Sequence, residues 1–369
     1  MFVARSLAGR EHFGNNPAPI MIVSTTLTGS NADIIRDALA SVVAQVDRCI
    51  VIDTGAKDDS LAVAREVAGD KLLVREFPWC NDFSAARNFA LQAATEAGAR
   101  WVVTVDTDER LLFDPGVTLR DALSRTRAKV LLIGHRDGSY AKERIIRLPT
   151  SNWWNGPTHE ALEGQRAGES EILQGVHFDE LRKDAAAMKL KFERDVAILA
   201  DYVKQHPTLP RWHYYLGASL HDLRRHEEAI ESFKTCAALK GWNEEGAWAC
   251  YRAAECYCAL KRWKEAIEMC GHGLAIRPAT AELAWMAGWA AFNLRQYEDA
   301  IAWSNMAVVN GFHDGAGAGF SRISFRYPYA LYEGPYETLK WTFERLGNHA
   351  AAKAAEKEAA AAKKRREGK

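Results

Sequence analysis

Between residues 19 and 178 the sequence alternates between two hydrophobic periods, which limits the folds open to this part of the chain. Apolar runs such as "PIMIVSTT", "RCIVID", "KLLVREF" and "RWVVTVD" predict buried strands, whereas intervening stretches such as "ADIIRDALASVVAQ" carry apolar pairs at helical spacing. Strands that alternate with helices predict a parallel, doubly wound sheet with right-handed crossovers. Later strands follow without long helices between them, so we expect a second, partly antiparallel sheet region at 129–178.

Beyond about residue 184 the strand signals end and helical spacing takes over. Three segments align through an Ala-Ile pair at 229/230, 266/267 and 300/301, so the copies are offset by 37 and then 34 residues. About 13 residues before each pair lies a matching group, at Leu216-Gly217, Ala253-Ala254 and Ala287-Gly288. Small residues there let antiparallel helices approach closely, and stacked pairs share one core. This is the tetratricopeptide pattern, and a weaker fourth pair is expected in "PYETLKWTFERLGNHAAAKAAEKEA".

The first helices of these pairs carry several aromatic residues. They are His213, Tyr214, Trp248, Tyr251 and Trp285. Most are expected in the core between helices. Two or three are expected to face a peptide, because stacked repeats form a long concave surface of the kind that binds polypeptides.

Composition excludes several classes of function. The chain has 48 basic and 48 acidic side chains, so its net charge indicates neither a nucleic-acid partner nor a membrane surface. The longest apolar stretch, "AELAWMAGWAAFNL", is too short to span a bilayer, and the N-terminus shows no signal peptide. Seven cysteines form no metal-like pair spacing. We therefore expect a cytoplasmic protein with no membrane span and no nucleic-acid partner.

The stretch "WVVTVDTDERL" at 101–111 joins an apolar strand directly to three acids, Asp106, Asp108 and Glu109. The carboxyl end of such a strand is where open α/β sheets hold their ligands. Clustered carboxylates repel one another unless a positive charge lies between them. Two interpretations follow: a divalent metal that carries a phosphate, or a solvated acidic turn.

Five motifs, taken in order, resemble the family 2 glycosyltransferases of the GT-A fold. They are "IVIDTGAKDDS", "FPWCNDFSAARNFAL", "VVTVDTDERL", "GPTHEAL" and "GVHF". With the repeats that follow, the chain resembles a bacterial subgroup that includes peptide and bacteriocin glycosyltransferases. Two turns depart from the family pattern: "TTLTGSN" stands where "KNE" is common, and Ala56 and Asp59 stand where Ser and Gly are usual.

The resemblance implies a divalent metal, Mn²⁺ or Mg²⁺, on the DxD-type motif. It assigns Asp108 to the metal and Asp106 to the donor ribose or the metal. The late-strand His177 is implied as a further metal ligand; the alternative is a histidine that is simply hydrogen-bonded on its strand.

Donor-binding candidates stand at the ends of the first two strands. They are Thr25, Thr26 and Asp53, although Asp53 could equally cap its own turn before Gly55. Arg87 is expected near the start of a helix, where phosphates bind. It would either contact the donor or brace the site through Asp82 or a motif carboxylate.

Acceptor-side candidates lie in "WWNGPTHEAL". An inverting transfer needs a base that takes the acceptor proton, for which we choose Glu160, with His159 as the second candidate. The alternative is that the pair orients its loop through hydrogen bonds. Trp153 and Trp154 are expected either to stack on a sugar or to anchor the loop.

These features predict an enzyme: a metal-dependent, inverting glycosyltransferase that uses a nucleotide sugar, UDP- or GDP-linked with UDP favoured. The repeats suggest a peptide or protein acceptor. A catalytically idle domain with the repeats as a protein-binding adaptor is the alternative, and a nucleotidyltransferase is a third interpretation.

The predicted fold is a Rossmann-like GT-A domain followed by an all-α solenoid. The expected divisions are an N-terminal extension at 1–18, the GT-A domain at 19–183, a linking helix at 184–209, three repeats at 210–312, and a helical cap with a basic tail at 313–369.

Overall fold

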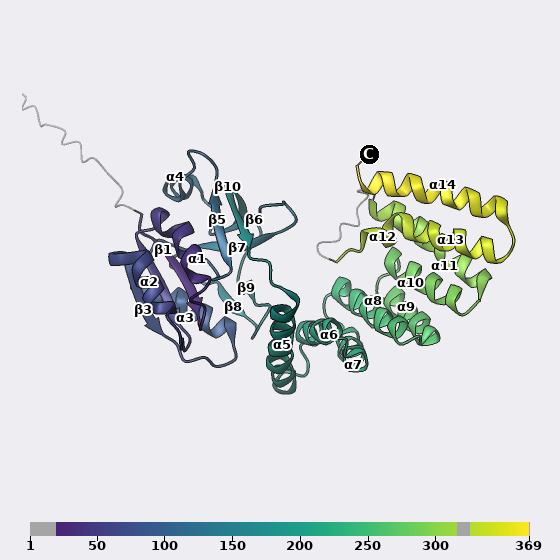
Figure 1. The fold of residues 1–369 in the computed structure, drawn as a ribbon, viewed down its shortest axis with the longest axis horizontal. Coiled ribbons are helices and arrows are strands. Elements are labelled where there is room, and N and C mark those ends of the chain that lie inside the picture. The colour runs from purple at the N-terminus through teal and green to yellow at the C-terminus, as the bar shows by residue number, and fades with distance from the viewer. Residues whose placement is uncertain (1–19, 316–324, 369) are drawn as a thin grey trace, which may run out of the picture. The chain divides into compact units, whose positions relative to one another are not determined.

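The computed structural model describes residues 20–315 and 325–368, in two compact units that divide between Arg182 and Lys183. The expected extension at 1–18 lies outside the described residues. The fold class predicted from sequence is confirmed: the first unit is an α/β domain and the second consists of helices (Figure 1).

The first unit is built around one eight-stranded sheet. Its strands lie in the order β3-β2-β1-β4-β7-β6-β10-β5. Its parallel half comprises β1 (Ile22–Thr28), β2 (Arg48–Asp53), β3 (Leu72–Glu76) and β4 (Trp101–Thr104). The other half comprises β5 (Glu109–Phe113), β6 (Val130–His135), β7 (Ala141–Arg147) and β10 (Ser170–Glu180). Because β7 pairs antiparallel with β4, the expected partly antiparallel region continues the first sheet. A separate hairpin consists of β8 (Trp153–Asn155) and β9 (Ala161–Glu163).

Helices cover both faces of the sheet because successive strand residues point to opposite sides. On one face, α1 (Ile35–Val42) and α4 (Leu119–Arg125) pack on strand residues such as Ile22 and Val103. On the other, α3 (Phe83–Glu96) packs on Val23 and Val102. The remaining helices of this unit are α2 (Ser60–Ala68) and the short η1 (Val43–Gln45) and η2 (Gly69–Lys71).

The second unit begins with α5 (Ala185–Gln205), and helix pairs follow it (Figure 1). Three pairs match the predicted repeats: α6 (Pro210–Asp222) with α7 (His226–Ala238), α8 (Asn243–Ala259) with α9 (Trp263–Ile276), and α10 (Ala281–Asn293) with α11 (Tyr297–Gly315). The short α12 (Pro328–Leu331) precedes the expected fourth pair, α13 (Glu333–Arg345) and α14 (His349–Arg366).

Close helix packing explains the small residues of the repeats. A Cβ atom at Gly217 would lie 2.8 Å from the ring of Phe233, and one at Gly288 would lie 2.8 Å from Ser304 Oγ. Ala253 and Ala254 are fully buried at the corresponding position. The prediction that small residues permit close approach is therefore confirmed.

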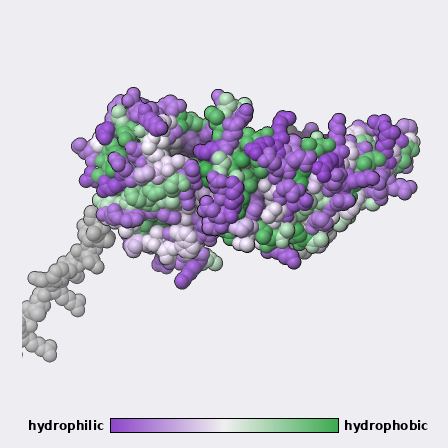
Figure 2. Space-filling view, turned by 90° about the horizontal axis from the view of Figure 1, so that it is seen from below, coloured by the Kyte–Doolittle hydropathy of each residue, from purple (hydrophilic) through white to green (hydrophobic). Residues whose placement is uncertain are grey.

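Hydrophobic residues reach the face seen in Figure 2 in small groups among hydrophilic ones. Among residues 20–315 and 325–368, no helix is both long and apolar enough to cross a bilayer.

Candidate functional site

The acids of "VDTDE" lie where the sequence predicts, at the carboxyl end of β4. Val105 N still donates to Thr25 O at 3.0 Å, so the backbone follows β1 up to Asp106. Glu109 N then donates to Asp106 O at 2.9 Å, which closes a tight turn that holds Asp108. Two acids therefore flank the turn and the third lies within it.

Two arginines from distant elements lie between the carboxylates. Arg87 Nη2 on α3 is 2.9 Å from Asp106 Oδ1, and its Nε donates to Glu160 Oε1. Arg144 Nη2 on β7 is 2.9 Å from Asp106 Oδ2 and also donates to Glu109 Oε1. The positive charge that these clustered carboxylates need is thus supplied by side chains of the protein itself.

Lys142 extends this arrangement, because it lies two residues before Arg144 on the same face of β7. Its Nζ is 3.0 Å from Glu109 Oε1 and also donates to Glu180 Oε1 at the end of β10. We call the whole set the charge cluster. Its cations are Arg87, Lys142 and Arg144, and its anions are Asp106, Glu109, Glu160 and Glu180.

Burial makes the balance of the charge cluster important, because an unpaired charge in a low-dielectric interior is costly. Glu109 is fully buried, and the side chains of Arg144 and Arg87 are 5% and 9% exposed. Burial alone would raise the pKa of Asp106, but Arg87, Arg144 and Lys142 outweigh it and hold that pKa well below its usual range. Burial likewise opposes the charge on Arg87, yet Asp106 and Glu160 raise its pKa.

A pH-dependent stability follows from the lowered pKa of Asp106. The ionised carboxylate stabilises the fold fully above its unfolded pKa, near 4, and this contribution is lost as the pH falls further. We expect Asp106→Asn to lower the free energy of unfolding by about 1–3 kcal/mol at pH 6, and the deficit relative to wild type to shrink below about pH 4. Urea titrations of both proteins between pH 6 and pH 3 measure this difference. A deficit that stays constant over that range would contradict the pairing.

Helix α3 positions Arg87 from one turn inside the helix and not from its first residues. Asp82 is the N-cap, and its Oδ1 accepts from Ala85 N at 2.9 Å and from Ser84 Oγ at 2.7 Å. Asp82 is therefore not the partner of Arg87. The structure instead shows Arg87 bracing a motif carboxylate, one of the two roles foreseen for it.

The same helix fixes the β8 hairpin. Asn88 Nδ2 donates to Trp154 O at 2.9 Å, and Asn88 Oδ1 accepts from Trp154 N at 2.8 Å. Trp154 is 5% exposed and its ring lies 5.4 Å from the Arg87 guanidinium carbon. Trp154 is thus an anchor of the hairpin, and its proposed stacking on a sugar is wrong. Trp153, at 51% exposed, remains accessible to a ligand.

His159 and Glu160 lie in the loop between β8 and β9. His159 has φ +51°, a left-handed conformation that is uncommon outside glycine. Phe83 N donates to Pro157 O at 2.8 Å, so the start of α3 holds this loop. The loop delivers Glu160 to Arg87 and thereby to Asp106, which joins three of the predicted site residues in one network.

The donor-side threonines occupy different positions from those expected. Strand β1 runs on to Thr28, because Leu27 and Thr28 pair with Ile52 and Asp53 of β2. Thr25 and Thr26 are consequently buried in mid-strand, at 3% and 1% exposed, and their placement at the strand end is wrong.

Asp53 does end β2, as predicted. Its Oδ1 accepts from Gly55 N at 2.9 Å and from Ala56 N at 2.8 Å, which is the turn-capping alternative.

His177 is not assembled with the acids. It pairs with Leu112, whereas Glu180 pairs with Glu109, so His177 lies three residues along β10, about 10 Å at 3.4 Å per residue. Its Nε2 is instead 3.8 Å from Asp114 Oδ1. Among the residues that the structure describes, no group of three or more His, Cys, Asp or Glu side chains could hold a metal. The structure therefore does not bring His177 together with Asp106 and Asp108, and a metal-ligand role for these residues stays a prediction.

Comparison with known proteins assigns the first unit. Residues 22–178 match the family model described as glycosyl transferase family 2. These residues form a family 2 glycosyltransferase domain. The chain is similar to the SPbeta prophage-derived glycosyltransferase SunS of Bacillus subtilis, at 25% identity over 54% of this chain and 49% of that protein.

Other similarities concern repeat proteins. A TPR repeat-containing protein of Synechococcus elongatus is 44% identical over 32% of this chain and 28% of its own length. The structure of MamA residues 41 to the end, from Desulfovibrio magneticus, matches 47% of this chain and 86% of that one, with 18% identity and a TM-score of 0.37. This chain spans less than half the length of the Synechococcus repeat protein and of SunS, the two curated relatives named here.

Sequence reasoning missed Lys142 and Arg144 of the glycosyltransferase domain. Both lie in "AKERIIRL", within the region 129–178 that the sequence predicts to form sheet. The signal that could have identified them is the pair of cations at alternate positions, Lys142 and Arg144, next to the apolar Ile145 and Ile146. A buried strand carries charged side chains only where anions lie beside them. Glu109 was noted as the third acid, and it is the carboxylate that both cations contact.

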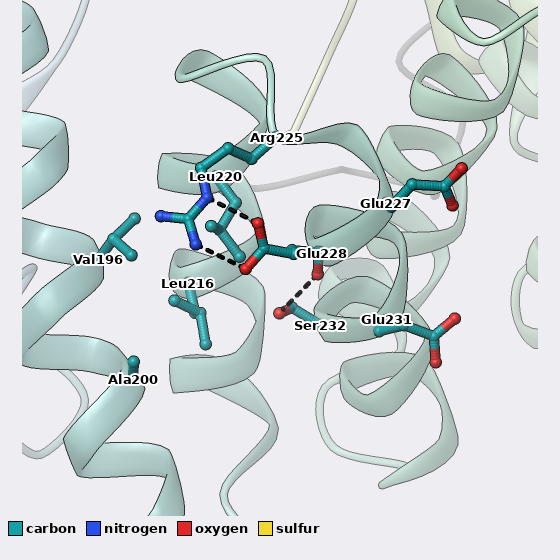
Figure 3. Close-up of a pocket in the computed structure, with 9 residues that line it drawn as sticks. All are labelled: Val196, Ala200, Leu216, Leu220, Arg225, Glu227, Glu228, Glu231 and Ser232. Carbon is teal, nitrogen blue, oxygen red and sulfur yellow. Dashed lines mark hydrogen bonds and ion pairs between the residues drawn. The ribbon is translucent and has the colours of Figure 1, made fainter.

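A hollow of about 420 Å³ lies within the second unit, among α5, α6 and α7. Figure 3 shows Val196, Leu216 and Leu220 on one side and glutamates of α7 on the other. Arg225 Nε donates to Glu228 Oε1 at 2.7 Å, and Arg225 Nη2 donates to Glu228 Oε2 at 2.6 Å. None of the predicted site residues lines this hollow.

Proposed function

We propose that the protein transfers a sugar from a nucleotide-sugar donor to an acceptor, at the face where Asp106, Arg87 and Glu160 meet. One observation carries the proposal: a strand-end acid, a helix arginine and a loop glutamate, from three separate motifs, form one network inside a family 2 glycosyltransferase domain. A UDP-sugar is favoured over a GDP-sugar, and the family implies an inverting reaction.

Arg87 supports a contact with the donor phosphates. Its Nη1 atom is buried and finds no hydrogen-bond acceptor among the described residues, although Nε and Nη2 are both paired. Buried donors are nearly always satisfied, so an acceptor that arrives with the substrate would complete this guanidinium. Arginine suits phosphate oxygens through its planar set of donors. As the donor loses its nucleoside diphosphate, Arg87 would stabilise the negative charge that develops there.

Asp108 is the proposed contact to Mn²⁺ or Mg²⁺. Magnesium commonly binds through one or two carboxylates together with substrate phosphates, so the absence of a three-residue ligand group among the described residues does not oppose it. Such a metal would neutralise the charge of the leaving diphosphate. Asp106 is already paired with two arginines. It is therefore better suited to hold those arginines in place or to accept a hydrogen bond from a ribose hydroxyl.

Glu160 is the proposed base. Its Oε1 is held by Arg87, and its Oε2 is the oxygen proposed to take the proton from the acceptor group as the new bond forms. Arg87 would then orient the base and the leaving group together. The exposed Trp153 is a proposed platform for the acceptor, and Asp53 remains a candidate contact to the nucleotide through its second oxygen.

The acceptor is proposed to be a peptide or protein side chain, because stacked helix pairs form surfaces that bind polypeptides. We place the reaction in the cytoplasm, since all seven cysteines are free thiols, as in a reducing compartment.

The first test is a calorimetric titration with nucleoside diphosphates and nucleotide sugars, each with and without Mn²⁺. We expect one nucleotide to bind only with metal, and Asp108→Asn to weaken that binding at least about 100-fold, equivalent to about 2.7 kcal/mol. The helical signal in circular dichroism should not change. Metal-dependent binding that survives in Asp108→Asn would remove Asp108 from the site.

The adaptor alternative is favoured by a specific observation. Asp106 is neutralised by Arg87 and Arg144 without any ligand, so the charge cluster is self-sufficient as a structural element. An idle domain predicts that no nucleotide of the panel binds, with or without metal, while the repeats still capture a polypeptide.

A further inference from the structure

A short segment of the chain lies along the first helices of the repeats. Phe325 contacts three rings: its centroid is 5.2 Å from that of Tyr214, 5.7 Å from that of Trp242 and 5.8 Å from that of Trp248. The rings of Phe325 and Trp248 are stacked, with 13° between their planes.

The next two aromatic residues of the segment repeat this behaviour at alternate positions. Tyr327 lies 6.4 Å from Tyr251 and 5.7 Å from Trp285, and Tyr329 meets Trp285 edge-on at 5.4 Å. Phe325, Tyr327 and Tyr329 therefore each place a ring on the repeat surface. Phe325 and Tyr327 precede α12, and Tyr329 lies within it.

The receiving rings occupy equivalent positions of successive repeats. Tyr214, Tyr251 and Trp285 are separated by 37 and then 34 residues, which are the offsets between the repeats themselves. Each repeat thus contributes one ring from its first helix, α6, α8 or α10. We call these three rings, with Trp242 and Trp248, the aromatic groove.

Two buried carboxylates bind the backbone of the segment. Phe325 N donates to Glu244 Oε1 and Tyr327 N donates to Glu282 Oε1, both at 3.2 Å. Glu244 is 8% exposed and Glu282 is fully buried. Backbone bonds at alternate residues combined with pockets for alternate side chains are the way in which proteins hold an extended peptide.

We propose that the aromatic groove is a binding site for an extended peptide that presents aromatic–X–aromatic, and that residues 325–327, which lead into α12, occupy it as a tethered ligand. The contacts use backbone N–H groups and rings, so any polypeptide that presents aromatic–X–aromatic in an extended form has the required chemistry. Because the tether gives residues 325–327 a high effective concentration, a partner peptide must displace them to bind. The inference does not rest on the proposed sugar transfer, since its test measures peptide binding alone.

The probe is a fluorescent peptide with the sequence of residues 325–331, "FRYPYAL", titrated into full-length protein and followed by fluorescence anisotropy. The variant Phe325→Ala/Tyr327→Ala should bind the probe at least about 10-fold tighter than wild type, because its own segment no longer competes. The matched control Phe325→Tyr/Tyr327→Phe keeps a ring at both positions and should bind like wild type. A control peptide with alanine in place of both rings should not bind.

A folded Phe325→Ala/Tyr327→Ala variant that binds the probe no tighter than wild type would overturn the proposal. A wild-type dimer that this variant fails to form would assign the segment to a second copy and overturn the tethered arrangement. Hydrogen exchange of wild-type protein gives an independent test. The amides of Phe325 and Tyr327 should exchange at least about 10-fold slower than in an unfolded chain, and excess probe should accelerate them. Exchange at the unfolded rate would equally overturn the proposal.

Discussion

Replacing Arg144 with methionine is expected to lower the free energy of unfolding of the glycosyltransferase domain by about 3–5 kcal/mol. The guanidinium is 5% exposed and contacts both Asp106 and the fully buried Glu109. Methionine fills much of the volume of the arginine but leaves two carboxylates near each other, with only Arg87 and the partly exposed Lys142 to offset them. Removing one partner of a buried ion pair costs more than the pair contributes, because a buried charge is left uncompensated.

The measurement is urea-dependent hydrogen exchange over residues 101–147, which follows the sheet without contributions from the repeats. Arg136→Met provides a matched control on the neighbouring β6–β7 turn. Arg136 is 69% exposed and lies 3.5 Å from Asp179, so its loss should cost no more than about 1 kcal/mol. An Arg144→Met protein as stable as the Arg136→Met control would show that the charge cluster does not hold the sheet together.

The fold was predictable because its signals are local. Apolar runs marked β1, β2, β3 and β4, and equal offsets between small residues marked three helix pairs. Predictions failed where the register between strands decides the outcome. The end of β1 depends on Leu27 and Thr28 finding partners on β2, and the position of His177 depends on the pairing of β10 with β5. Neither register can be read from hydrophobic periodicity alone.

The candidate site was predictable in its anions and not in its cations. Asp106 and Asp108 follow an apolar strand, so the sequence alone predicts that they lie at the carboxyl end of that strand. Arg144 reaches Asp106 only because β7 inserts antiparallel beside β4, a neighbour relation that no local pattern encodes. The sequence allowed two explanations for the clustered acids: a divalent metal that carries a phosphate, or a solvated turn. The structure adds a third, in which the guanidinium groups of Arg87 and Arg144 neutralise the carboxylates.

Glu160→Gln is expected to reduce turnover by about 10²–10⁴-fold while leaving the affinity for the donor nearly unchanged. The amide keeps the size of the side chain and can still accept a hydrogen bond from Arg87 Nε, so the position of Arg87 against Asp106 is retained. What is lost is the second carboxylate oxygen, the proposed acceptor of the proton. The measurement is release of nucleoside diphosphate from the donor that calorimetry identifies, in the presence of acceptor peptides.

His159→Gln is the matched comparison, because His159 is the adjacent candidate and precedes Glu160 in the same loop. A base at Glu160 predicts a small effect of His159→Gln on turnover, under about tenfold, provided that the left-handed backbone at φ +51° is maintained. If His159→Gln abolishes turnover and Glu160→Gln does not, the base is the histidine and Glu160 only positions Arg87. Equal and large losses of donor affinity in both variants would instead mean that the loop as a whole forms the donor site. The two substitutions therefore separate proton transfer from loop geometry, because only proton transfer lowers turnover at unchanged donor affinity.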